Sequence, residues 1–371
     1  MSRKKSRLKL AQEEAQAAID KTNDKISKLG EQTSSLYLAL NDIQTLFDVI
    51  RNVPTEKKLE YEKFKEIRLN WKQQAEKIEN DYKAAAVKDA GAGVAGVGAG
   101  VAVVALGPTA AMGIATTFGV ASTGTAISTL SGAAATNAAL AWLGGGALAA
   151  GGGGMSAGSA FLALAGPIGW AIAGVALIAS GLMFWKSMSD KSHIEDIFTL
   201  ISKRDVKSYD LAIVELSERI TRIITENELL RNAISQIKSF GTDYNTMSEA
   251  QQYELGSYVN LMSSSTQLLV NPIMGLLPKF DEPDFENYST WEKRTIDDPI
   301  LTNYKELIIS FANLLYKIDL NDKDKKLLYK TFRANKKMLK SLNMKKKEFV
   351  PEIFDAVEEV LLFDIGADKK R

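Results

Sequence analysis

Few side chains in this sequence are of the types that perform nucleophilic, thiol or metal chemistry. The chain of 371 residues has no cysteine and a single histidine, His193. Disulfides, thiolate nucleophiles and Cys/His zinc sites are therefore excluded. A nucleophilic serine such as Ser159 would have only His193 as its base. The spacing of Ser192 and Glu195 is that of a capping box, which predicts that His193 lies in the first turn of a helix. We therefore expect His193 neither to be catalytic nor to bind a metal ion.

Phosphate-binding and dinucleotide-binding motifs are also missing from the sequence. There is no Gly-Lys dipeptide, which a P-loop of the Walker type requires. The G-x-G-x-x-G match at residues 91–96 has no acidic residue about 20 positions further on to bind a ribose. Acidic residues are abundant elsewhere, so paired-carboxylate chemistry stays open, although no spacing singles out a pair. We expect a protein that is not an enzyme and that has no cofactor.

The central part of the chain is a long segment without charge. Residues 90–185 contain no Asp, Glu, Lys, Arg or His, and they hold 22 of the 27 glycines. The end of this segment, residues 161–185, is strongly apolar, and its final tryptophan next to Lys186 is placed as an interfacial anchor. A helix over this stretch, rising about 1.5 Å per residue, is longer than the ~30 Å hydrocarbon thickness of a bilayer. The residues of this span that we expect to contact the membrane are Phe161, Trp170, Gly174 and Trp185.

Small residues recur every four positions in the rest of the charge-free segment. This spacing lets helix backbones approach closely inside a bilayer, where lipid supplies no hydrophobic drive for association. A Gly/Ala-rich sequence contains such matches by chance, but three registers in one charge-free block favour membrane insertion. The alternatives are a fully buried helical hairpin in a soluble protein and a disordered low-complexity segment. The positions that we expect to pack are Gly96, Gly100, Ala141, Gly145, Ala149, Gly153, Gly154 and Gly158.

Long amphipathic helices are predicted on both sides of the charge-free segment. Apolar residues alternate at spacings of three and four over residues 19–50, 64–82 and 209–237. The first two stretches are expected to form a helical hairpin packed on the rest of the protein, with an intermolecular coiled coil as the alternative. Asn227 lies in the apolar stripe of the third stretch. Its amide would either fix the register or partner number of that helix, or bond to a neighbouring backbone group.

The C-terminal part contains a capping box at Ser248 and Gln251, a proline-rich connection at residues 272–299 and a basic helical stripe. A basic stripe can lie on an anionic membrane or bind phosphates, but a solvated lysine face is the commoner outcome. The helix that follows Pro351 is acidic and could partly neutralise the stripe. The residues of the stripe, which are candidates for contact with anionic lipid, are Lys326, Lys330, Arg333, Lys337 and Lys340.

These patterns predict an all-α fold in which long amphipathic helices form an elongated bundle around or next to the charge-free segment. We expect four regions, namely an N-terminal helical hairpin at 1–89, the segment at 90–185, coiled-coil-like helices at 186–271 and C-terminal helices at 272–371. The formal charge of +1 argues against a general nucleic-acid-binding protein, so no nucleic-acid partner is expected.

The order of these features resembles that of bacterial α-helical pore-forming proteins, in which a helical bundle stores a hydrophobic hairpin and releases it into a membrane. The small-residue registers at 91–107 and 141–158 and the apolar span that follows them carry this resemblance. The chain is also similar in this respect to colicins and apolipoprotein L, which bury a hydrophobic hairpin. The charge-free segment is longer than one hairpin requires, which leaves room for about four crossings or two hairpins.

The resemblance implies a membrane-inserting, pore-forming or membrane-perturbing toxin or defence effector. Its partners would be a lipid bilayer, further copies of the chain and, as a candidate, a helical protein. A constitutive integral membrane scaffold and a soluble helical interaction protein are the alternatives. The first residues are basic but are not followed by an apolar run, so we expect synthesis in the cytoplasm without a signal peptide, then membrane association or signal-independent secretion.

Overall fold

The computed structural model of the chain describes residues 7–91, 108–118, 188–277, 279–280, 282–334, 339 and 344–368. All regular secondary structure in these residues is helical, which confirms the all-α class, and their single β-bridge is an isolated pair between Arg51 and Asp243. The elements are α1 (Arg7–Asp48), α2 (Thr55–Gly91), α3 (Pro108–Phe118), α8 (Met188–Ile237), η2 (Tyr244–Thr246), α9 (Glu249–Val270), η3 (Met274–Leu276), α10 (Glu282–Ser289), α11 (Asp298–Leu315), α12 (Asp322–Ala334) and α14 (Glu352–Asp368).

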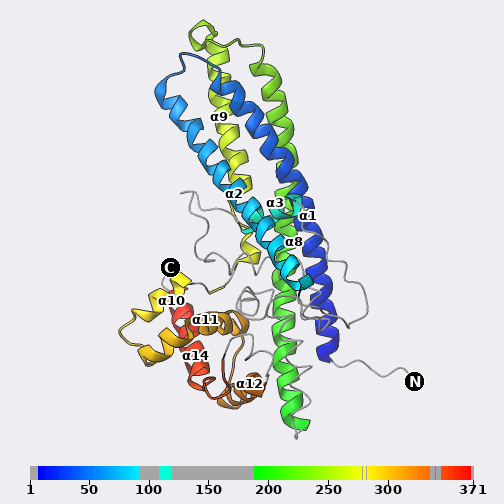
Figure 1. Cartoon of the computed structure of the whole chain (residues 1–371), viewed down its shortest axis with the longest axis vertical. Helices are drawn as coiled ribbons and strands as arrows, with labels where there is room; N and C mark the ends of the chain where they lie inside the picture. Colours follow the sequence, from blue (N-terminus) through cyan, green and yellow to red (C-terminus); the bar gives the residue numbers. More distant parts are fainter. Residues whose placement is uncertain are drawn as a thin grey trace, which may run out of the picture.

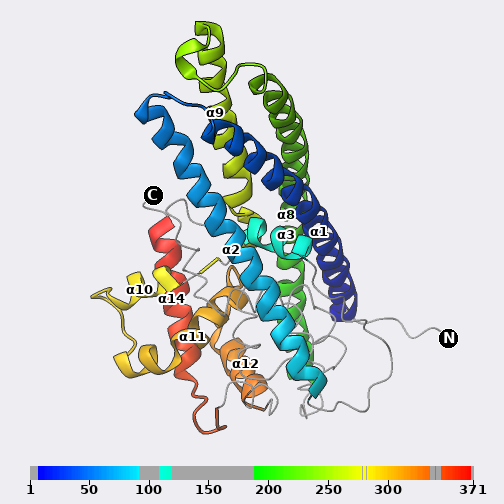
Figure 2. The same ribbon diagram turned by 45° about the horizontal axis from the view of Figure 1, so that its top comes forward.

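Four long helices form the elongated bundle at the centre of the molecule (Figure 1). α1 and α8 pack along one another in the same direction, and α2 and α9 return beside them. The turns that follow α1 and α8 meet at the upper end, where the Arg51 N–H donates to the Thr242 carbonyl at 2.9 Å and the Tyr244 N–H donates to the Arg51 carbonyl at 3.0 Å. α2 ends and α8 begins toward the opposite, lower end of the bundle, as Figure 2 also shows.

The apolar stripe predicted for the first helix forms the face of α1 that is buried in the bundle. Leu29, Leu36, Leu40 and Ile43 on this face are fully buried. Burial of one such side chain contributes about 1.5 to 3 kcal/mol to folding, so this stripe accounts for much of the α1–α8 association. The helix begins earlier than the stripe suggested because alanines and one leucine continue the same spacing toward the N-terminus. These buried residues are Leu8, Ala11, Ala15 and Ala18.

The apolar stripe at residues 209–237 is likewise confirmed as the inner face of α8. Leu216, Ile223 and Leu230 on this face are fully buried. The helix start predicted at Ser192 is wrong, because α8 already begins at Met188. Asp190 supplies the acidic residue that favours the first turn, since carboxylates interact well with a helix N-terminus.

The capping box predicted at the start of the next helix is confirmed. The Gln251 N–H donates to Ser248 Oγ at 3.3 Å, and the Ser248 N–H donates to Gln251 Oε1 at 2.9 Å. The two bonds satisfy backbone groups that the first turn of α9 leaves without helical partners. α9 therefore starts at the residue that the sequence indicates.

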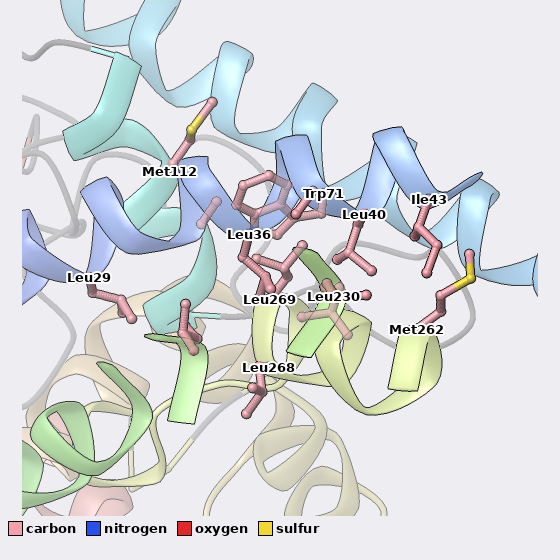
Figure 3. Close-up of a cluster of buried hydrophobic side chains, with 14 of the residues drawn as sticks. Leu29, Leu36, Leu40, Ile43, Trp71, Met112, Leu230, Met262, Leu268 and Leu269 are labelled. Carbon is pink, nitrogen blue, oxygen red and sulfur yellow. The ribbon is translucent and has the colours of Figure 1, made fainter. Parts of the chain in front are cut away.

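The buried apolar side chains of α1, α2, α3, α8, α9 and η3 form one cluster, which we call the bundle core (Figure 3). Residues from both sides of the charge-free segment, and from inside it, contribute to this cluster. Its labelled members in Figure 3 are Leu29, Leu36, Leu40, Ile43, Trp71, Met112, Leu230, Met262, Leu268 and Leu269.

A second cluster, the C-terminal core, joins α10, α11, α12 and α14 to the first turns of α8. The rings of Phe311 and Phe332 lie 4.8 Å apart at its centre, and α8 contributes Ile194 and Phe198. The guanidinium of Arg204 on α8 donates to the carbonyls of Leu314 and Tyr316 at the end of α11, at 2.9 and 2.6 Å. α8 is thus shared by both cores and connects them.

The proline-rich connection at 272–299 contains more regular structure than the sequence indicated. It includes η3 and α10. Its aromatic residues pack on the C-terminal helices, because Phe285 is buried and the Trp291 ring lies 5.3 Å from that of Phe363 on α14.

No helix among the described residues is both long enough and apolar enough to cross a membrane. The stretch at 161–185, for which a membrane span is predicted, lies outside the described residues.

Candidate functional site

The most informative part of the structure is the position of α3, which belongs to the charge-free segment. α3 begins with Pro108, a residue favoured in the first turn of a helix, and packs between α1 and α2 (Figure 2). Residues 111–117 are all buried there. The predicted N-terminal hairpin is therefore opened along part of its length, with an uncharged helix inserted between its two arms.

Above α3, large side chains connect α1 and α2 directly. The rings of Phe47 and Tyr61 lie 5.1 Å apart, and Asp48 accepts from Lys65 Nζ at 3.0 Å. Such long side chains span the space between two backbones that do not approach closely. The hairpin is thus held at its turn while its arms leave room for α3.

The closest approach of α3 to α1 is at a pair of glycines. A Cβ atom added to Gly113 would lie 2.2 Å from the Ile26 carbonyl oxygen, and one added to Gly30 would lie 1.8 Å from the Thr109 carbonyl oxygen. Both distances are far shorter than any van der Waals contact, so the backbones themselves touch here. Gly30 and Gly113 are needed at this crossing because no larger side chain fits.

Hydrogen bonds fix α3 to its other neighbours. The indole N–H of Trp71 on α2 donates to Thr116 Oγ1 at 3.2 Å, and both side chains are fully buried. The Ile273 N–H, next to η3, donates to the Thr117 carbonyl at 2.6 Å at the C-terminal end of α3. These bonds satisfy polar groups that would otherwise be costly to bury.

One buried charge lies in the same region of the bundle. Arg68 on α2 is 1% exposed and donates to Gln44 Oε1 at 2.8 Å and Thr266 Oγ1 at 3.3 Å. No carboxylate forms an ion pair with it among the described residues, and its Nε has no partner there. Burial lowers the pKa of Arg68 to about 10, because desolvation disfavours the charged form. The guanidinium thus joins α2 to both α1 and α9 through hydrogen bonds, at a cost in desolvation.

The predicted basic stripe lies only partly within the described residues. Lys326 and Lys330 on α12 are exposed, and the Arg333 guanidinium packs 5.5 Å above the Tyr329 ring. The same guanidinium donates through Nε to the Lys346 carbonyl at 3.2 Å. Lys337 and Lys340 lie outside the described residues.

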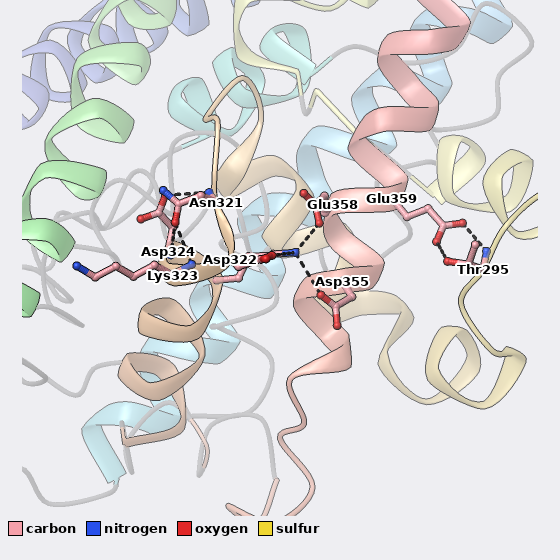
Figure 4. A network of polar contacts seen from close by, with 9 residues as sticks. Thr295, Asn321, Asp322, Lys323, Asp324, Asp355, Glu358 and Glu359 are labelled. Carbon is pink, nitrogen blue, oxygen red and sulfur yellow. Dashed lines mark hydrogen bonds and ion pairs between the residues drawn. The ribbon is translucent and has the colours of Figure 1, made fainter.

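The acidic helix α14 neutralises a different lysine from those of the stripe. Lys325 Nζ lies 3.1 Å from Asp322, 3.5 Å from Asp355 and 2.7 Å from Glu358, and Figure 4 shows these carboxylates converging. Its hydrogen bond to Glu358 raises the pKa of Lys325. The carboxylate of Glu359 instead accepts from the Thr295 N–H at 2.6 Å. These acids therefore leave Lys326 and Lys330 without counter-ions among the described residues.

His193 lies in the second turn of α8 and not in the first, because α8 begins at Met188. Its imidazole Nε2 is bonded to the carboxylate of Asp324 on α12. Asp324 also accepts from the Asn321 N–H at 2.9 Å, so the contact links α8 to the capped N-terminus of α12 (Figure 4). No group of three or more His, Asp and Glu side chains in the described ranges is placed to hold a metal ion.

Asn227 lies on α8 where it faces α1. Its Nδ2 donates to Ser35 Oγ at 2.7 Å, while its Oδ1 has no partner among the described residues. The bond joins the two side chains and does not involve a neighbouring backbone group. A role of Asn227 in fixing the register of α1 against α8 stays a prediction.

The other residues predicted to insert or pack in the membrane lie outside the described residues. They are Gly96, Gly100, Ala141, Gly145, Ala149, Gly153, Gly154, Gly158, Phe161, Trp170, Gly174 and Trp185.

Sequence reasoning missed the residues that hold α3, although one signal for them was present. Gly30 is the only glycine in residues 1–89, and it stands inside a long helical pattern. A glycine there costs about 1 kcal/mol against alanine, so it indicates a close approach of another backbone. The partner of Gly30 could not be identified in this way, because the charge-free segment is full of glycine.

Comparison with known proteins gives no direct indication of function. No protein-family model matches the chain, and neither a curated protein nor a solved structure is similar enough to count as a match.

Proposed function

We propose that this protein inserts into membranes and permeabilises or perturbs them, with the helical bundle storing part of the charge-free segment until release. The observation that carries the proposal is the burial of α3 between α1 and α2. An uncharged helix from the predicted membrane-inserting segment is covered there by amphipathic helices. This arrangement is what a stored state of such a segment requires.

The chemistry of α3 supports its transfer from the bundle to lipid. Its sequence from Pro108 to Phe118 has no charged residue, so no charge has to lose its hydration when the helix enters a hydrocarbon layer. Thr117 Oγ1 donates to the Gly113 carbonyl at 2.7 Å, so this hydroxyl is satisfied within the helix itself. This hydroxyl therefore needs no partner outside the helix, either in the bundle or in lipid.

The packing mode of α3 also supports the proposed membrane state. In the bundle, Gly113 contacts Gly30 through bare backbone. The small-residue registers at 91–107 and 141–158 offer the same kind of surface for contacts between helices in lipid. We therefore propose that release exchanges a glycine contact with α1 for glycine contacts within the segment and between copies of the chain.

The proposal can be tested on the full-length chain purified without detergent. Flotation with liposomes and release of an encapsulated dye are measured for the wild type and for the double variant Gly145→Leu, Gly153→Leu. The wild type is expected to float and release dye, whereas the variant is expected to float but release much less dye. Gly256→Leu is a matched control, because a Cβ atom at Gly256 on α9 has nothing within 4 Å.

Three results would contradict the proposal or part of it. Protein that needs detergent to stay in solution would indicate a constitutive membrane scaffold. Soluble protein that neither floats nor releases dye would indicate a helical interaction protein. Full dye release by the double variant would rule out the small-residue contacts as the basis of permeabilisation.

A further inference from the structure

The C-terminal helices carry an exposed cluster of cations that the predicted stripe only partly described. Lys345, Lys346 and Lys347, in the turn before α14, are exposed like Lys326 and Lys330. We call these five lysines and Arg333 the basic surface. From its position and pairing we infer that the basic surface docks the protein on an anionic lipid bilayer.

The acidic side chains close to the basic surface pair with other groups. The five lysines have no ion-pair partner within the described part of the chain, because Asp322, Asp355 and Glu358 are all directed to Lys325. The nearest acid in sequence, Glu348, accepts from the Lys345 backbone N–H at 2.7 Å. The lysine ammonium groups are therefore left to interact with an external anion.

Tertiary contacts hold the two segments of the basic surface together. The contacts of Arg333 with the Tyr329 ring and with the Lys346 carbonyl fix the turn at 345–347 against the end of α12. Two segments that are separate in sequence thereby present their lysines as one group. A planar array of lipid phosphates can be contacted by several such cations at once, each contributing about 1 kcal/mol.

The position of the basic surface in the molecule also favours a bilayer as its partner. α12 and the turn after it lie at the lower end of the molecule, where α8 begins and toward which α2 runs (Figures 1 and 2). The bond between His193 and Asp324 joins α12 directly to α8 at this end. The charge-free segment connects α2 to α8, so contact through the basic surface would bring both its ends near the bilayer. This location favours lipid over nucleic acid as the source of the phosphates, as does the overall charge of +1.

The inference rests on the proposed function, and its test separates the two. Flotation of the full-length protein is compared on vesicles of phosphatidylcholine alone and of phosphatidylcholine with phosphatidylglycerol, at low and high salt. We expect binding to anionic vesicles that falls with salt, and at least about tenfold weaker binding for Lys330→Glu, Lys346→Glu. The control, Lys63→Glu, Lys238→Glu, makes the same charge change at exposed positions in the first turns of α2 and just past the end of α8. These helix ends lie at the upper end of the bundle (Figure 1), so the control should bind like the wild type.

Each contrary outcome has a distinct meaning. Equal binding of the wild type to neutral and anionic vesicles, or equal loss in both double variants, would overturn the docking inference and leave the proposed function intact. Binding to neither kind of vesicle would overturn both. If Lys330→Glu, Lys346→Glu bound vesicles normally but lost affinity for a short DNA duplex, the basic surface would be a nucleic-acid site, and the inference would be wrong.

Discussion

The indole N–H of Trp71 donates a hydrogen bond to Thr116 Oγ1 at 3.2 Å, across the interface between the charged helix α2 and the uncharged helix α3. The Trp71 ring also lies 5.4 Å from the ring of Tyr37 on α1. The Trp71 side chain therefore links its own helix α2 to α1 and to the inserted helix α3. Removal of the Trp71 side chain should therefore weaken the packing of α3 in the bundle more than the packing of α1 against α8.

The Trp71–Thr116 bond can be tested by a double-mutant cycle. Trp71→Phe removes the donor and part of a buried ring, so we expect the free energy of unfolding to fall by about 2 kcal/mol. Thr116→Val removes the acceptor and should cost about 1 kcal/mol. Urea unfolding of both single variants and the double variant should give a double loss smaller than the sum. Strictly additive losses would show that the bond does not stabilise the bundle.

Because Gly30 and Gly113 cross so closely, we expect a Gly→Ala substitution at Gly113 to lower the free energy of unfolding. The same substitution at Gly256 should raise it. Gly113→Ala places a methyl group 2.2 Å from the Ile26 carbonyl, so α3 must move away from α1. We expect lower stability, by about 2 kcal/mol or more, and faster dye release from liposomes. Gly256→Ala has open space and should raise stability by up to about 1 kcal/mol, since alanine is the better helix former. Equal stabilities of the two variants would contradict the close crossing.

Because the charge of Arg68 is buried, we expect its removal to stabilise the bundle in which α3 is packed between α1 and α2. Burial lowers the pKa of Arg68 to about 10, well below its ordinary value, so keeping the cation buried at neutral pH costs folding free energy. Arg68→Met should raise the free energy of unfolding by about 2 kcal/mol and slow dye release. Arg68→Lys keeps the charge with fewer donors and should be less stable than the methionine variant. A destabilised methionine variant would mean that the bonds to Gln44 and Thr266 outweigh the cost of burial.

The sequence alone was sufficient to predict the long helices but not the position of α3. Leu36, Leu216 and Leu230 follow a spacing of three and four among charged residues, and that contrast identifies a buried face. The residues of α3 show no such contrast between apolar and charged positions, because the neighbouring residues in the sequence are also uncharged. The burial of Arg68 was also unpredictable, since arginine normally lies on the surface and only its tertiary neighbours reveal the exception.

The ion pairing of the lysines near the basic stripe also could not be predicted from the sequence. The helical spacing of Lys326 and Lys330 was enough to place them on one face, but ion pairing depends on a contact between helices. Glu358 lies 33 residues from Lys325, and no local pattern indicated that they would meet. The contribution of the turn at 345–347 was missed for the same reason, because it depends on the tertiary contact with Arg333.

Asp205 gives a prediction for pH dependence. It lies on α8 beside Arg204, whose Nη2 and Nε donate to Asp205 Oδ1 at 2.6 and 2.9 Å, while Oδ2 has no partner in the described residues. Burial raises the pKa of Asp205 to about 6, although Arg204 opposes the shift. Because the folded pKa lies above the unfolded value near 3.8, the stability from this group is fully present below about pH 4. It is lost as the pH rises through about 6.

Lowering the pH from 7 to 5 should therefore stabilise the wild type through Asp205 by about 1.4 kcal/mol. Asp205→Asn cannot take up this proton, so its unfolding free energy should change by that much less over the same interval. Asp210→Asn is the control, because Asp210 is an exposed carboxylate on the same helix. Urea unfolding of the three proteins at both pH values measures the difference. An Asp205→Asn variant with the same pH response as the wild type would show that the buried carboxyl group does not take up a proton over this range.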